Sequence, residues 1–95
     1  MAGYVIADVD VTAPELFAKY RDLVGPTVEK YGGEYLARGG DVEVLEGDRV
    51  AHRTVIIRFD SAERAREWYH SDEYAPALKM RLEAANSHVL IVDGA

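Results

Sequence analysis

The sequence predicts an α+β fold, with one antiparallel sheet of four strands and helices on one face of that sheet. Three observations support this prediction. Several short segments alternate with a period of two, longer segments between them have helical spacing, and the segments follow one another in the order β-α-β-β-α-β. That order is the split βαβ, or ferredoxin-like, arrangement. With 95 residues, the chain is expected to form a single domain over residues 1–95.

The first strand is expected at residues 4–11, YVIADVDV, where small apolar side chains alternate with other types. Thr12 and Glu15 then have the spacing of a capping box, which predicts the start of a helix. Apolar residues at helical spacing continue this helix to about Tyr31. The Gly-Pro pair that ends at Pro26 predicts a kink or a break, because proline removes a backbone hydrogen bond.

The other extended segments are short. Residues 34–38 and 42–45 are expected on either side of a Gly-Gly-Asp turn. Residues 53–59, RTVIIRF, are rich in β-branched side chains and predict the strongest strand. The last strand is expected at residues 88–92, after a break at Asn86-Ser87.

The second helical segment is expected to start at Asp60-Ser61, where either Asp60 with Glu63 or Ser61 itself supplies the cap, and to restart at Ser71. The two acids that follow Ser71 favour the positive end of a helix dipole. The apolar stripe of the restarted helix is expected at Tyr74, Leu78 and Leu82.

The composition excludes several classes of function. The chain has no cysteine, so it cannot form disulfides, thiolate zinc sites, iron–sulfur clusters or a thiol nucleophile. Its formal net charge of -6 repels phosphate backbones, which argues against a nucleic-acid partner. The N-terminus has no signal-peptide pattern, and no apolar run approaches the about 20 residues that a membrane-spanning helix needs. We therefore expect a cytoplasmic protein with no membrane association.

The outward-facing positions of the sheet predict a homodimer. Ile6, Leu36 and Ile56 are expected to lie side by side on the face that the helices leave open. A contiguous apolar patch of this kind is typical of an interface, and a short domain gains most from a second copy of itself. The charged residues expected to pair around its rim are Asp8, Glu34, Arg38 and Arg58. The alternative is a monomer with a partly apolar surface.

The stretch REWYHSDEYAPA, residues 66–77, holds the densest group of candidate site residues. Trp68, Tyr69 and Tyr74 could line a pocket for a flat organic ligand, with His70 as a general base. The structural alternative is favoured, because aromatics at helical spacing are usually core and His70 suits the C-terminal end of a helix.

Arg38 and Asp8 are further candidates. Arg38 precedes two glycines and could hold a carboxylate, although pairing with an acid at the dimer interface is the favoured alternative. Asp8 could serve as a base in place of histidine. The histidines are scattered singly and form no H-x-x-x-H or H-E-x-x-H motif, so we predict no metal site and no cofactor.

Three stretches carry a resemblance to a known family: YGGEYLARGGDVEVLEGD, VIIRFDSAERAREWYHSDEYAPAL and VLIVDG. They resemble the small bacterial proteins catalogued as domain of unknown function thirteen-thirty, and the likeness spans nearly the whole chain. The resemblance implies a dimeric α/β barrel of the ferredoxin-like superfamily. Relatives in that superfamily include cofactor-independent monooxygenases, muconolactone isomerases, haem-degrading enzymes and chlorite dismutases. The family has no established reaction, so the resemblance implies no catalytic role for any residue here.

The sequence leaves open whether the protein is an enzyme. One hypothesis is a cytoplasmic homodimer that binds, or binds and transforms, a small organic molecule without a cofactor. The alternative is a non-catalytic dimeric module for ligand sensing or association. The two hypotheses differ in the space between sheet and helices: the first requires a cavity with converging polar groups, whereas the second predicts a space filled by the protein's own side chains.

Overall fold

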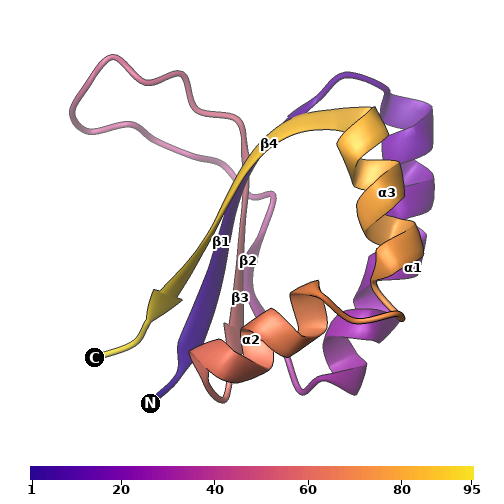
Figure 1. Cartoon of the computed structure of the whole chain (residues 1–95). Coiled ribbons are helices and arrows are strands. Elements are labelled where there is room, and N and C mark those ends of the chain that lie inside the picture. Colours follow the sequence, from indigo (N-terminus) through magenta and orange to yellow (C-terminus); the bar gives the residue numbers. More distant parts are fainter.

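The computed structural model describes all 95 residues and contains one antiparallel sheet and three helices (Figure 1). The elements are β1 (Gly3–Val11), α1 (Pro14–Lys30), β2 (Glu34–Arg38), β3 (Arg53–Phe59), α2 (Ala62–Tyr69), α3 (Ala75–Ala84) and β4 (Ala85–Asp93). The four strands lie in the order β2-β3-β1-β4, and every neighbouring pair is antiparallel. The predicted α+β, ferredoxin-like fold is confirmed.

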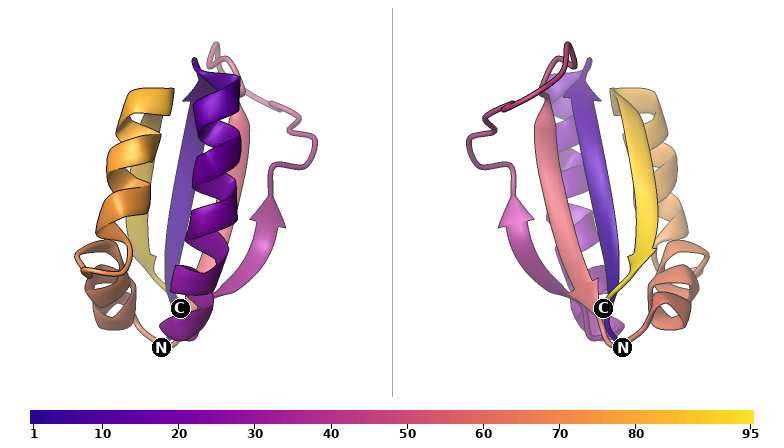
Figure 2. Two further views of the ribbon diagram at one scale, coloured as in Figure 1. Left: turned by 90° about the vertical axis from the view of Figure 1, so that its right-hand side faces the viewer. Right: turned by 90° about the vertical axis from the view of Figure 1, so that its left-hand side faces the viewer.

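All three helices lie on one face of the sheet, and the other face is uncovered (Figures 1 and 2). The central strand β1 shows the cause, because Val5, Ala7 and Val9 are buried against the helices while the residues between them point the other way. Val28 of α1 and Trp68 of α2 pack against the same side. No helix in the chain is both long enough and apolar enough to cross a membrane.

Helix α1 is continuous from Pro14 to Lys30, so of the kink or break predicted near Val24, the break does not occur. Two features hold the helix together past the proline. The Thr27 hydroxyl donates to the Val24 carbonyl at 2.7 Å, and both Val24 and Val28 are buried in the core. Burial of this apolar stripe outweighs the loss of one backbone hydrogen bond.

The turn before α1 is anchored by tertiary contacts instead of the predicted capping box. The amides of Thr12 and Ala13 donate to the Ala84 carbonyl at 2.8 and 2.9 Å, and the Thr12 hydroxyl donates to the same oxygen at 3.1 Å. Thr12 therefore closes the end of α3 and makes no cap on α1. Strand β4 begins at Ala85 directly after α3, and the predicted break at residues 86–87 is absent.

The two serines expected to start helices behave differently. Of the two caps predicted for α2, Ser61 is the one that forms, since its hydroxyl accepts from the Arg64 amide at 3.0 Å. The Ser71 hydroxyl donates to the Trp68 carbonyl at 2.7 Å and accepts from the Tyr74 amide at 3.1 Å. Ser71 therefore stabilises a turn between α2 and α3, and α3 begins later, at Ala75.

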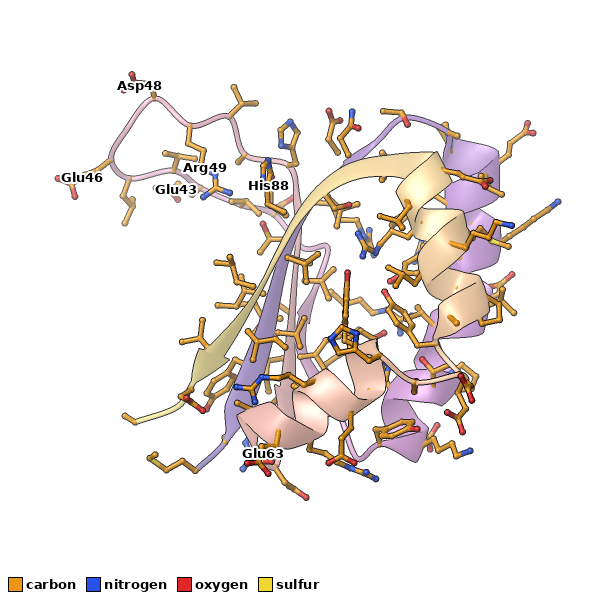
Figure 3. The ribbon with its side chains drawn as sticks, in the orientation of Figure 1. Glu43, Glu46, Asp48, Arg49, Glu63 and His88 are labelled. Atoms are coloured by element: carbon orange, nitrogen blue, oxygen red, sulfur yellow. The ribbon has the colours of Figure 1, made fainter.

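Residues 39–52 form a long loop without helix or strand, so the extended segment predicted at residues 42–45 is wrong. The loop extends beyond the uncovered side of the sheet, away from the helices (Figures 1 and 3). Glu46 and Asp48 point outward from it (Figure 3). The large aliphatic side chains that it exposes are Val42, Val44, Leu45 and Val50. This segment has no buried face, which is why its alternation did not produce a strand.

A β-bulge in β2 reverses the alternation of its side chains. Tyr35 pairs with Ile57, but Ala37 pairs with Ile56, so Leu36 is an extra residue between them. After the bulge Arg38 pairs with Val55, whose side chain faces the helices. The prediction that Arg38 lies among the rim charges of the open face is therefore wrong, because the bulge turns it to the helix side.

Gly3 allows the start of β1 to approach the start of α2 closely. A Cβ atom on Gly3 would overlap the backbone of Ser61 and Ala62, which cannot rotate aside. We expect Gly3→Ala to lower the free energy of unfolding by about 2–3 kcal/mol and the Tm by roughly 10–20 °C, measured by thermal denaturation with circular dichroism. The control is Gly40→Ala, where no atom lies within 4 Å of the new Cβ. Equal Tm values for the two variants would contradict the close approach.

Candidate functional site

A cleft between the sheet and the helices contains a cavity of about 40 Å³. Its walls are mostly apolar side chains from the strands, including Val5, Ala7, Val55 and Val89. One ordered water needs roughly 10–15 Å³, so the cavity has room for at least one water-sized group. The protein's own side chains therefore leave part of this space open.

The aromatic wall of the cleft contains the three aromatics that the sequence singled out. Trp68, Tyr69 and Tyr74 all line it. The ring centroid of Trp68 lies 4.2 Å from that of Tyr74 and 5.5 Å from that of Phe59, and its indole Nε1 donates to the Thr27 hydroxyl at 3.0 Å. Trp68 and Tyr74 are 2% and 1% exposed, so these side chains belong to the hydrophobic core and also form a wall of the cleft.

A chain of hydrogen bonds runs from Arg81 through Tyr74 to Tyr20 in the same cleft. Arg81 Nε donates to the Tyr74 hydroxyl at 3.4 Å, and the Tyr74 and Tyr20 hydroxyl oxygens are 3.2 Å apart. Whichever phenol donates in the pair, only one of the two phenolic protons is used, and the other is free for a further acceptor. Burial, followed by the proximity of Tyr74, raises the pKa of Tyr20, so this phenol stays protonated and can donate.

The charged residues that line the cleft are all arginines: Arg21, Arg38, Arg53 and Arg81. None of them belongs to any of the ion pairs in the structure. The Arg38 guanidinium lies 4.2 Å from the ring centroid of Tyr35, and that of Arg53 lies 5.6 Å from the ring centroid of Phe17. Arg38 and Arg53 therefore stack on aromatic faces, and none of the four arginines has a carboxylate partner.

Arg53 is the most constrained of the four arginines. Its Nε is buried and has no hydrogen-bond partner. Burial lowers the pKa of Arg53, and the positive charges of Arg21 and Arg38 lower it further. Gly39 makes room for this guanidinium, because a Cβ there would collide with it, and the φ of 74° at Gly39 favours glycine as well.

The pKa of Arg81, which is 4% exposed, shifts in the opposite direction to that of Arg53. Burial alone lowers the pKa of Arg81, but the phenols of Tyr74 and Tyr20 outweigh it and the net shift is upward. The guanidinium is therefore a permanent buried cation, with Tyr74 as its hydrogen-bond partner.

The two candidate bases lie outside the cleft. Asp8 is on the open side of the sheet, where its Oδ2 is 3.1 Å from His52 Nδ1 and its Oδ1 accepts from the His52 amide at 3.3 Å. The side-chain hydrogen bond from His52 is the main cause of the lowered pKa of Asp8. His70 is exposed at the end of α2, with its ring edge-on to Tyr69 at 5.3 Å. The cleft lining therefore contains no carboxylate and no imidazole.

No three histidine, aspartate or glutamate side chains gather where they could share a metal ion. His52 is held by Asp8, His70 is at the end of α2, and His88 lies on the open side of β4 (Figure 3). The expectation that the protein needs no metal stays a prediction.

Sequence reasoning missed Tyr20, Arg53 and Arg81 as cleft residues. In the stripe predicted for the restarted helix, Tyr74 is buried as expected, but Leu82 is 65% exposed and the residue before it, Arg81, is buried instead. Arg81 lies seven residues after Tyr74, which is a helical spacing, and this spacing could have identified it. An arginine in that position was passed over because charged residues are seldom fully buried.

The open face of the sheet is a second surface of interest. One row crosses all four strands and is aliphatic throughout: Ala37, Ile56, Ile6 and Leu90. Leu90 is 58% exposed and the neighbouring Leu36 of the bulge is 51% exposed. Val92, 43% exposed, extends the patch along β4. The contribution of β4 was not foreseen from the sequence.

These features define a small ferredoxin-like α+β protein with an arginine- and tyrosine-lined cleft under its helices. The chain belongs to the family described as Domain of unknown function (DUF1330), whose model matches residues 2–95. This match confirms the family resemblance seen in the sequence.

Solved structures support the fold. RPA0582, a protein of unknown function from Rhodopseudomonas palustris, is 22% identical with a TM-score of 0.75, and the match covers 99% of this chain and 82% of that chain. An ethyl tert-butyl ether d (ethd) family protein from Bacillus halodurans is 15% identical with a TM-score of 0.62, over 100% of both chains. An antibiotic biosynthesis monooxygenase is 10% identical with a TM-score of 0.58, over 100% of this chain and 99% of that chain. No curated protein matches the chain. Identities this low show the fold alone.

Glu73 fastens the turn that carries Tyr74 to the end of α1. Its carboxylate accepts from the Lys30 ammonium group and, at 2.9 Å, from the Tyr31 hydroxyl. The hydrogen bond from Lys30, then those from its own backbone amide and from Tyr31, lower the pKa of Glu73 to about 2 from an ordinary value of 4.5. The stability gained from this ionised group is present above pH 4.5 and is lost as the pH falls towards 2.

We expect Glu73→Gln to lower the Tm by a few degrees at neutral pH and by progressively less below pH 4.5. In that range the carboxyl group of the unfolded wild-type chain takes up a proton, whereas the folded protein stays ionised down to about pH 2, so the stability gained from the ionised group shrinks. The effect is small because the pair is exposed to solvent. The measurement is Tm against pH for both proteins. Glu63→Gln is the control, since Glu63 is exposed at the start of α2 and forms no ion pair (Figure 3). A Tm difference that stays constant down to pH 3 would contradict the assignment.

Proposed function

We propose that the protein binds a small organic molecule in the cleft between the sheet and the helices. The observation that carries this proposal is the cavity of about 40 Å³, open between apolar and aromatic walls, on which a few polar groups converge. Ligand sites in proteins typically combine an apolar cavity with a small number of placed polar groups.

The size and walls of the cleft favour a small ligand with an apolar body. Ligand pockets for drug-sized molecules usually have volumes of about 300–1,000 Å³, far larger than this cavity. The enclosed part therefore accepts one end of a ligand, and the remainder lies in the mouth of the cleft. Trp68 and Tyr69 offer aromatic surface to a flat or branched apolar group.

The groups in the cleft support binding better than proton-transfer catalysis. Tyr20 and Tyr74 can donate hydrogen bonds, and four arginines can hold negative charge. A general base must reach its proton directly or through one water, and Asp8 and His70 lie elsewhere. We therefore infer a role in ligand binding or sensing, with transformation of the ligand as the less supported alternative.

Trp68 is the only tryptophan of the chain and lines the cleft, so its fluorescence reports on the occupant. We expect small aromatic and branched aliphatic acids, amides or alcohols at millimolar concentration to change its emission. Ala7→Leu places its larger side chain in the cavity and should abolish the response, at a cost of about 1–3 kcal/mol in the free energy of unfolding. Ala18→Leu, on the exposed side of α1, is the matched control and should respond as wild type does. An unchanged response in Ala7→Leu, or no response to any of these compounds, would contradict the proposal.

We also propose that two copies of the chain associate through the open face. Only 17 of the 95 residues are buried in one chain, so a single copy has little core to stabilise it. Ile6 and Ile56 are partly covered by their neighbours in the sheet, whereas Leu36 and Leu90 are more than half exposed. A second copy with the same patch would cover them in a two-fold arrangement.

Light scattering at low micromolar concentration should give twice the chain mass of 10.6 kDa. Leu90→Asp should reduce this mass to that of one chain, because it would bury a charge without a partner. Ile56→Asp should dissociate or unfold the protein for the same reason. Leu82→Asp is the control, since Leu82 is equally exposed but lies on α3, away from the open face. A wild-type protein with the mass of one chain would contradict the dimer proposal.

A further inference from the structure

We propose that the ligand of the cleft is an organic carboxylate, with its head group held by the guanidinium groups of Arg53 and Arg81. This inference rests on the proposed function and names the chemical class of the ligand. It follows from the charges that the cleft contains and from the partners that those charges lack.

The first argument is the uncompensated charge of Arg81. Charged groups buried in proteins are normally paired, and a guanidinium cannot lose its proton to escape the cost. Arg81 is 4% exposed, and its hydrogen-bond partner is the neutral phenol of Tyr74. The chain has 17 acidic residues and 11 basic ones, yet no acid lines the cleft. A negative charge supplied from outside the chain would complete this pair.

The second argument is the unused donor of Arg53. Its Nε is buried without an acceptor, and such a group usually indicates a partner that the protein itself does not supply. The guanidinium is positioned against Gly39 and over the ring of Phe17. A carboxylate can accept from Nε and from one terminal nitrogen of the same guanidinium, which is the bidentate geometry that arginine favours.

The third argument is the repulsion among the arginines. The positive charges of Arg21 and Arg38 add to burial in lowering the pKa of Arg53, so both disfavour its charged form. An anion between them would relieve this repulsion. Arg21 and Arg38 are exposed at the edge of the cleft, where they can also attract an anion that the remainder of this acidic protein repels.

The free phenolic proton supplies a further contact. The Tyr20–Tyr74 pair has one proton left after its internal hydrogen bond, and both hydroxyl-bearing residues line the cavity. This proton can be donated to the second oxygen of a carboxylate. Tyr20 is an electrostatic neighbour of both Arg53 and Arg81, so we place the head group beside this phenol, between the two guanidinium groups.

A carboxylate fits the cleft better than a phosphate does. The cavity of about 40 Å³ is small, and most of its lining is apolar. A dianionic phosphate would lose more hydration on entering such a space than a singly charged carboxylate. The adjoining apolar walls then suit a short aliphatic or aromatic group attached to the carboxylate.

The test is to titrate the protein with small-molecule probes and to monitor its ¹H–¹⁵N NMR spectrum, including the arginine Nε–H signals. The probes are two matched pairs, benzoate with benzamide and isovalerate with isovaleramide, and inorganic phosphate at the same ionic strength. We expect benzoate or isovalerate to shift the Arg53 Nε–H signal and the Trp68 indole signal, and to bind at least about tenfold more tightly than its amide.

Substitutions of the arginines test which of them contacts the carboxylate. Arg53→Met and Arg81→Met should each weaken carboxylate binding by about 10- to 100-fold. Arg53→Lys keeps the positive charge but loses the paired N–H donors of the guanidinium, so it should bind carboxylates more tightly than Arg53→Met and more weakly than wild type. Arg66→Met removes an exposed arginine outside the cleft and should bind as wild type does. If Arg81→Met does not fold, as judged by its amide spectrum, the two Arg53 variants decide the question alone.

Three outcomes would overturn the inference, and they differ in what they leave standing. Equal binding of an amide and its acid would show a neutral ligand site, so the carboxylate assignment fails and the proposed function survives. Phosphate binding as tight as that of the carboxylates would point to a different anion. No shift of any cleft signal with any probe would remove the carboxylate site and the proposed function together.

Discussion

The packing of Trp68 holds the helices at their distance from the sheet, and the rest of the site depends on it. Its ring lies between Phe59 of β3 and Tyr74 before α3, and its indole nitrogen donates to Thr27 of α1. One side chain thus joins three helical segments to a strand. Tyr74 then connects to Tyr20 and to Arg81, so the polar chain of the cleft extends from the aromatic core. Large buried rings suit this role because they fill the space between layers in a defined geometry.

The cleft differs from an ordinary protein core because some of its buried polar groups lack a matching partner. A buried guanidinium with a phenol for a partner and a buried donor with no partner both cost stability. Local features that cost stability without a compensating internal contact are found most often at functional sites. Arg81 and Arg53 face the same cavity from opposite layers, one from α3 and one from β3. The two faces of the sheet therefore differ in character, with cationic groups under the helices and an aliphatic row on the open side.

Part of the candidate site could be predicted from the sequence. Trp68, Tyr69 and Tyr74 stand close together in a helical segment, and local spacing is enough to place them on one inner side. Arg38 was identified as an anion-binding candidate but placed on the open face, because a bulge cannot be seen in a strand of five residues. Arg81 has the helical spacing of a buried position, but it was missed because charged residues are seldom buried, and the phenol of Tyr74 that accepts its hydrogen bond is seen only in the structure.

The sequence by itself determined the order of the elements, the positions of the main strands and the side of β1 that is buried, since these follow from periodicity between near neighbours. Only the tertiary structure decided that α1 continues through Pro26, that residues 39–52 remain a loop and that Leu36 forms a bulge. It also decided that the space under the helices stays partly open. These features depend on contacts between residues far apart in the chain, and local propensity is overruled wherever such packing is worth more free energy.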